Sequence, residues 1–119
     1  MATNTVTHIV QQGGIKTGIT ALAGGATPSA AANTLEGINY VSTCATDGDS
    51  VILPAGMPAG TVIWVHNAGA ARLDVFPNTG ASINGGTATT GDFAVATTKA
   101  AVFVQYGTNG LSWIGLTGA

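Results

Sequence analysis

The residues that could carry out chemistry are few and lie far apart in the sequence. The chain has two histidines, His8 and His66, one cysteine, Cys44, and one glutamate, Glu36. A zinc site needs three or four nitrogen, sulfur or carboxylate ligands, and no cysteine or carboxylate stands near either histidine at a suitable spacing. We therefore expect no metal site, and we interpret the histidines as surface or hydrogen-bonded residues.

Asp47, Gly48 and Asp49 resemble half of a calcium-binding loop. Such a loop also needs ligands at further alternating positions and a bidentate carboxylate downstream, and no glutamate follows Asp49. Aspartate side chains readily accept hydrogen bonds from backbone amides in turns. This segment is therefore predicted to be a turn.

No arrangement of nucleophile and base is evident either. Cys44 lies inside a predicted strand, where a small apolar residue filling space is the simpler interpretation. The serines lack the Gly-x-Ser-x-Gly pattern, and the glycine pairs are not followed by Gly-Lys-Ser or Gly-Lys-Thr. One Glu and four Asp in turn-like settings do not form the carboxylate pair of a glycosidase. We expect a protein that is not an enzyme and has no cofactor.

The composition excludes several other classes. Only 7% of the 119 residues are charged, and the three Lys and Arg residues are too few for a nucleic-acid surface. A hydrophobic fraction of 45% with a net charge of −2 argues against a disordered chain, and no apolar run is long enough to span a membrane. A single cysteine cannot form an intrachain disulfide. The first 12 residues do not resemble a secretory signal, which predicts synthesis in the cytoplasm.

Short β-branched segments separated by Gly, Pro, Asn and Asp predict an all-β protein. We expect a small antiparallel sandwich or barrel-like domain over residues 36–119, preceded by an N-terminal arm and connector over residues 1–35. The strands of the domain are predicted at residues 38–45, 50–53, 61–67, 71–76, 82–83, 92–96, 100–106 and 111–116.

Two of these strands are apolar on both faces. At residues 61–67, Val62, Trp64 and His66 share one face while Ile63 and Val65 share the other. Residues 101–106 are also largely apolar on both faces. Such strands must be covered on both sides, by a second sheet and a loop or by another subunit, so a homo-oligomer is favoured.

The two tryptophans are the remaining candidates for a binding role. Trp64, inside an apolar strand, is expected in the core or at a subunit interface. For Trp113, in the last strand, an edge or interface position is equally plausible.

One long stretch resembles a known group of proteins. TCATDGDSVILP at residues 43–54 leads into AGTVIWVHNAG at residues 59–69, followed by VFP at 75–77, INGG at 83–86 and Trp113. This order resembles small all-β virion proteins of tailed bacteriophages, and most closely the capsid decoration (cement) proteins. The resemblance covers residues 38–116, but similar segments also occur in tail-fibre and baseplate modules.

The resemblance implies a structural protein of the virion without enzymatic activity. It implies a homotrimer on the capsid exterior that stabilises the head by clamping adjacent copies of the major capsid protein. Contacts to the capsid or between subunits are then expected from Ile9, Val10, Ile15, Ile19, Trp64 and Trp113.

Two questions stay open from the sequence. The residues before position 36 either form an extended arm that adds a strand to a neighbour's sheet edge, or form the first strands of the domain itself. The alternative function is a tail-fibre or baseplate module that binds a host surface glycan, with Trp113, Tyr106 and Asn109 as the local candidates.

Overall fold

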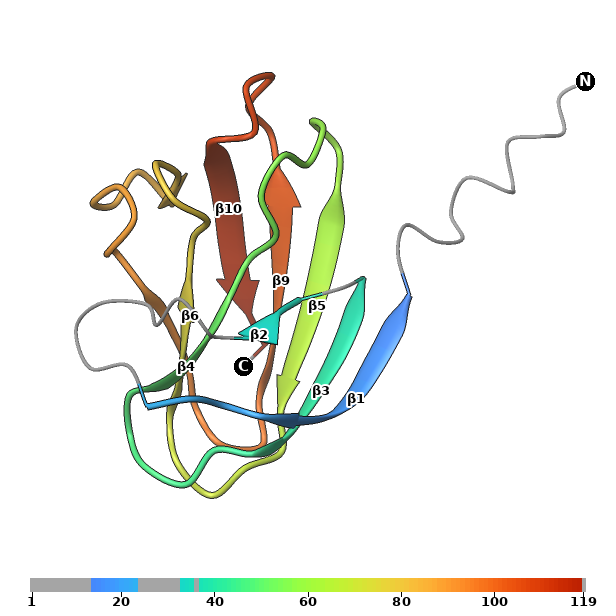
Figure 1. The fold of residues 1–119 in the computed structure, drawn as a ribbon, viewed down its shortest axis with the longest axis vertical. Helices are drawn as coiled ribbons and strands as arrows, with labels where there is room; N and C mark the ends of the chain where they lie inside the picture. The colour runs from blue at the N-terminus through green and yellow to red at the C-terminus, as the bar shows by residue number, and fades with distance from the viewer. Residues whose placement is uncertain (1–13, 24–32, 36, 119) are drawn as a thin grey trace, which may run out of the picture.

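The computed structural model describes residues 14–23, 33–35 and 37–118, which form ten strands and no helix (Figure 1). None of these residues lies in a helix that could cross a membrane. The strands are β1 (Ile15–Thr20), β2 (Asn33–Thr34), β3 (Ile38–Thr43), β4 (Asp49–Ile52), β5 (Val62–Asn67), β6 (Leu73–Phe76), β7 (Ser82–Ile83), β8 (Phe93–Val95), β9 (Ala100–Gln105) and β10 (Ser112–Thr117).

The strands form two sheets packed as layers. One sheet has six strands in the order β1-β3-β5-β9-β10-β7, and the other has four in the order β2-β4-β6-β8. The predicted all-β class is confirmed. The predicted strands from residue 38 onward match β3 to β10, with ends that differ by no more than two residues.

The expectation of an antiparallel domain is wrong, because both sheets are mixed. Consecutive strands from β1 to β8 alternate between the two sheets, so neighbours within a sheet are usually two apart in the sequence. From β1 to β6 the chain crosses to the other sheet after each strand and returns to the first sheet in the same direction. Five strand pairs are parallel, and only three, β9 with β10, β5 with β9 and β6 with β8, are antiparallel.

The core lies between the sheets and is built from one side of each strand. Period-two alternation places these side chains inward, where they are almost completely removed from water. From the six-stranded sheet come Val41, Ile63, Val65, Ala101, Phe103 and Trp113, and from the four-stranded sheet Val51, Leu73, Val75 and Val95.

Asn67, at the end of β5, is the main polar link between the layers and is fully buried. Its side-chain amide donates to the carbonyls of Ala71 and Val95, both at 2.9 Å, and its Oδ1 accepts from the amide of Gly69 at 2.9 Å. Three satisfied hydrogen bonds offset the cost of burying this side chain. Asn67 therefore fixes the crossover from β5 to β6 against β8.

The first strand is part of the domain and not a separate arm. β1 pairs in parallel with β3, and β2 pairs in parallel with β4, so residues on the N-terminal side of the predicted boundary at 35 and 36 belong to both sheets. Ile19 lies in the core with 3% of its surface exposed. The sequence left open whether the residues before position 36 form an extended arm or the first strands of the domain itself. Residues 15–20 form a strand of the domain. Ile9 and Val10 lie outside the described residues.

The Asp47 segment is a turn, as predicted. Gly48 has a φ of 96°, a left-handed conformation that favours glycine. Asp49 Oδ2 accepts from the amide of Thr46 at 3.1 Å, and Asp47 Oδ1 accepts from the amide of Arg72 at 2.8 Å. Both carboxylates thus hold backbone amides around the entry to β4.

Candidate functional site

The outer side of the six-stranded sheet carries a continuous set of apolar side chains. The strand register aligns Ile15 on β1, Ile38 on β3, Trp64 on β5, Val102 on β9 and Leu116 on β10 in one row across five strands. Adjacent strands are about 4.8 Å apart, so this row is roughly 19 Å long. It runs across nearly the whole width of the sheet.

Two shorter rows flank the first on the same side of the sheet. In one, Val62, Val104 and Ile114 lie opposite each other on β5, β9 and β10. In the other, Tyr40, His66 and Ala100 lie opposite each other on β3, β5 and β9. We refer to these eleven residues together as the apolar outer face.

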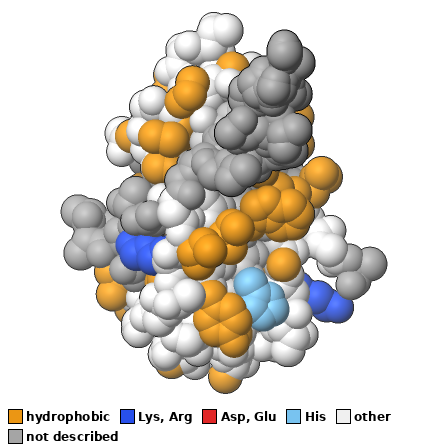
Figure 2. All heavy atoms as spheres, turned by 90° about the vertical axis from the view of Figure 1, so that its right-hand side faces the viewer, with side chains coloured by type: hydrophobic (Ala, Val, Ile, Leu, Met, Phe, Trp, Pro, Cys, Tyr) orange, Lys and Arg blue, Asp and Glu red, His pale blue; other side chains and the backbone are white. Residues whose placement is uncertain are grey.

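The apolar outer face is open to solvent in the single chain. Its six most exposed side chains have between 42% and 72% of their surface accessible, with Ile15 the highest. Together they leave roughly 600 Å² of mostly apolar surface exposed, at the upper end of the largest patches on monomeric proteins. Figure 2 shows part of this surface, with hydrophobic side chains across the middle, Lys and Arg at the margins and no acidic side chain in view.

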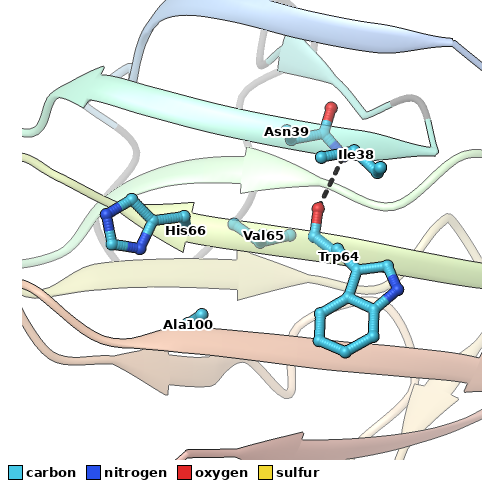
Figure 3. Close-up of a pocket in the computed structure, with 6 residues that line it drawn as sticks. All are labelled: Ile38, Asn39, Trp64, Val65, His66 and Ala100. Atoms are coloured by element: carbon cyan, nitrogen blue, oxygen red, sulfur yellow. Dashed lines mark hydrogen bonds between the residues drawn. The ribbon is translucent and has the colours of Figure 1, made fainter.

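A hollow of about 260 Å³ opens in this face between the Trp64 and His66 side chains (Figure 3). Ile38, Val65, Ala100 and the buried Asn39 complete its lining, which is almost entirely apolar. The Asn39 side-chain amide donates to the Trp64 carbonyl at 3.0 Å and fixes β3 against β5 beneath the hollow. The His66 ring also contacts the Tyr40 ring, with 5.3 Å between the two centroids.

The four aspartates and Arg72 lie on or beside the strands of the other sheet, whereas Lys16 lies on β1 and Lys99 directly before β9. Arg72 Nε donates to Asp74 Oδ1 at 3.0 Å, and Asp74 lies between Ser50 and Ala94 in the register of β4, β6 and β8. Burial raises the pKa of Asp74 above its ordinary value, and the hydrogen bond from Arg72 opposes this effect. The pKa of Arg72 is raised in turn by its hydrogen bond to Asp74.

Of the six residues predicted as contacts, the four that the structure describes do not come together in one site. Trp64 and Ile15 lie in the same row of the apolar outer face, 51% and 72% exposed. Ile19 and Trp113 are core residues, and the Trp113 indole Nε1 donates to Asn78 Oδ1 at 2.8 Å inside the domain. Their side chains cannot contact a partner because the domain itself covers them.

The three residues suggested for glycan binding are not brought together either. Tyr106 is 55% exposed, whereas Trp113 is completely buried. Asn109 uses its Oδ1 to accept from the amide of Leu111 at 3.0 Å within a turn. A buried indole cannot stack on a sugar, so this combination of residues is wrong as a site.

Among the described residues that could carry out chemistry, His66 belongs to the apolar outer face and Cys44 and the aspartates do not. Cys44 is buried, and its burial, followed by the nearby aspartates, raises the pKa of its thiol to about 11. A thiol with so high a pKa is a poor nucleophile at neutral pH. Within residues 14–23, 33–35 and 37–118, no three His, Cys, Asp or Glu side chains lie close enough to hold a metal ion.

The sequence analysis identified Trp64 and Ile15 but missed the four other exposed members of the face, Ile38, Tyr40, Ile114 and Leu116. The sequence does show that neighbouring strands are apolar on both faces. Which of these side chains lie side by side in one patch depends on the strand register, and the sequence does not give the register. In comparisons with known proteins, no family model matches the chain and no curated protein matches it.

Proposed function

We propose that this protein is a non-enzymatic structural protein of a tailed-phage virion, which decorates the outside of the head and reinforces the capsid by clamping adjacent major capsid proteins. The observation that supports this role most strongly is the apolar outer face. Six large side chains that are 42% to 72% exposed make a surface suited to a permanent protein contact. The resemblance of residues 38–116 to decoration proteins supplies the virion context.

The chemistry of the face favours a protein partner over a glycan. Sugar recognition combines an aromatic platform with several hydrogen-bonding groups that contact hydroxyls. The hollow beside Trp64 is lined almost entirely by apolar atoms, and the Asn39 amide at its base already donates to a backbone carbonyl. A protein side chain fits this lining better than a sugar does.

The proposed assembly is a homotrimer bound to the capsid exterior. A trimer presents each capsid contact three times, so weak individual contacts combine into firm attachment. Ile9 and Val10 remain the predicted capsid contacts, and both lie outside the described residues. No catalytic group is required for such a role, because reinforcement depends only on shape and contact area.

Quantitative mass spectrometry of purified virions tests this function, with the major capsid protein as the internal reference. The proposal expects a ratio that approaches one copy per capsid subunit, as for a protein repeated over the shell. A ratio of a few percent or less would move the protein to the tail or to a single vertex and favour the tail-fibre or baseplate alternative. Absence from the particles would contradict both virion roles.

A further inference from the structure

The apolar outer face has the composition of an interface that is never exposed in the mature molecule. Permanent interfaces between identical chains are more apolar than transient ones and resemble a domain core cut in half. The rows across β1, β3, β5, β9 and β10 consist of Ile, Val, Leu, Ala, Trp and Tyr side chains, with His66 as the one exception. Their roughly 600 Å² of exposed surface is close to the ~800 Å² that each partner contributes to a standard interface.

The edges of the sheets offer a poorer route to association. In the described part of the chain, the edge strands β2, β7 and β8 have only two or three residues each. β1 is longer, but Gly18 has a φ of 67° and the register with β3 shifts on either side of Ile19. Short or irregular edge strands resist pairing with another chain. The broad face is therefore the more favourable contact surface.

The face also carries both halves of a complementary contact. The Trp64 indole projects from β5 with 51% of its surface exposed, and the hollow of about 260 Å³ opens directly beside it. One water occupies about 30 Å³ in the liquid, so the hollow has room for a large side chain. A surface that carries both halves of a contact can pair with its equivalent about a two-fold axis or close into a ring about a three-fold axis.

We propose that the apolar outer face is covered by the same face of another copy of this chain, with the Trp64 indole of each copy in the hollow of its neighbour. A second copy brings none of the four aspartates into the contact, because they lie away from the face, on or beside β4, β6 and β8. The basic side chains at the margins of the face stay in the solvated rim (Figure 2). This inference rests on the assembly in the proposed function, in which it assigns the face to the contact between subunits, and its test on the purified chain gives an answer whether or not the protein belongs to a virion.

Sedimentation equilibrium of the full chain tests the proposal directly. The wild-type chain should have two or three times the 11.7 kDa mass of one chain. Trp64→Ser, which removes the projecting side chain, should sediment as one chain. Leu116→Lys, two strands away in the same row, should do the same, because it places a charge inside the contact.

Leu111→Ser is the matched control. Leu111 is 37% exposed but lies in the turn before β10, outside the three rows, so this variant should keep the wild-type mass. Circular dichroism of each variant checks that the fold is intact. A wild-type chain that stays monomeric at its highest soluble concentration, or folded Trp64→Ser and Leu116→Lys variants that both keep the wild-type mass, would overturn the proposal.

Discussion

Trp64 and Trp113 show how differently the two sides of one sheet are used. Both belong to the six-stranded sheet, yet Trp113 points into the core with none of its surface exposed, whereas Trp64 points outward with 51% exposed. The indole N–H of Trp113 has a buried partner in Asn78, 2.8 Å away. The inner side of the sheet is covered by the four-stranded sheet, whereas the outer side is equally apolar but is not covered within the single chain.

The outer sides of the two sheets differ as well. The four-stranded sheet carries the ion pair between Arg72, directly before β6, and Asp74 on β6, near Asp47 and Asp49 at the start of β4. The apolar outer face of the other sheet has no charged residue in its three rows. Ser50, Asp74 and Phe76 on the four-stranded sheet are buried within the chain, so the large exposed surface without charges is the apolar outer face of the six-stranded sheet.

The largest effect is expected from Trp113→Ala. Removing a buried indole creates a cavity and leaves Asn78 without its partner, at a cost of about 3–5 kcal/mol in the free energy of unfolding. Urea unfolding in dilute solution measures this loss. Trp64→Ala is the matched variant on the opposite side and should cost less than about 1 kcal/mol. Equal losses in the two variants would show that the two sides do not differ.

Asn67→Ala should have the next largest effect. The substitution leaves the carbonyls of Ala71 and Val95 and the amide of Gly69 without their buried partner, and we expect a loss of about 2–3 kcal/mol. The control is Asn109→Ala, at an exposed turn, which should cost less than about 1 kcal/mol. A small loss for Asn67→Ala in urea unfolding would mean that the two layers are held together without this link.

The smallest expected effect is a pH dependence of the free energy of unfolding that is caused by Asp74 on the four-stranded sheet. Because the pKa of Asp74 is raised in the folded chain, the folded state holds this proton at a pH where the unfolded state has released it. Stability should therefore fall slightly as the pH rises above 3.8, the ordinary value of the group. Asp74→Asn should remove this slope when urea unfolding is repeated across the acidic range. An unchanged slope would assign the dependence to other carboxyls.

Much of the fold can be predicted from the sequence, because strands and turns are local features. Segments of alternating β-branched residues, separated by Gly, Pro and Asp, locate β3 to β10. The turn at Asp47 is predicted because aspartate side chains accept hydrogen bonds from backbone amides in turns. Strand pairing cannot be predicted in this way, since alternation between two sheets depends on contacts far apart in the chain. β2, with two residues, is too short to give a periodic signal.

The site was only partly predictable for a related reason. Alternation separates Trp113 from Ile114 and Trp64 from Ile63, but it does not say which member of each pair faces the core when both are apolar. Trp113 faces the core, where Asn78, 35 positions away in the sequence, supplies a buried acceptor for its indole N–H. For Trp64 the decision comes from the register with Ile38 and Val102, which only the assembled sheet defines.

The most direct test of the central claim, that the apolar outer face is a covered contact surface, is the fluorescence of Trp64 over a dilution series. Subtracting the spectrum of Trp64→Phe from that of the wild-type chain isolates its emission from that of Trp113. We predict emission typical of a buried indole at high concentration, either shifting to the red on dilution or staying unshifted in a tight oligomer. Emission typical of a water-exposed indole at every concentration would contradict the account.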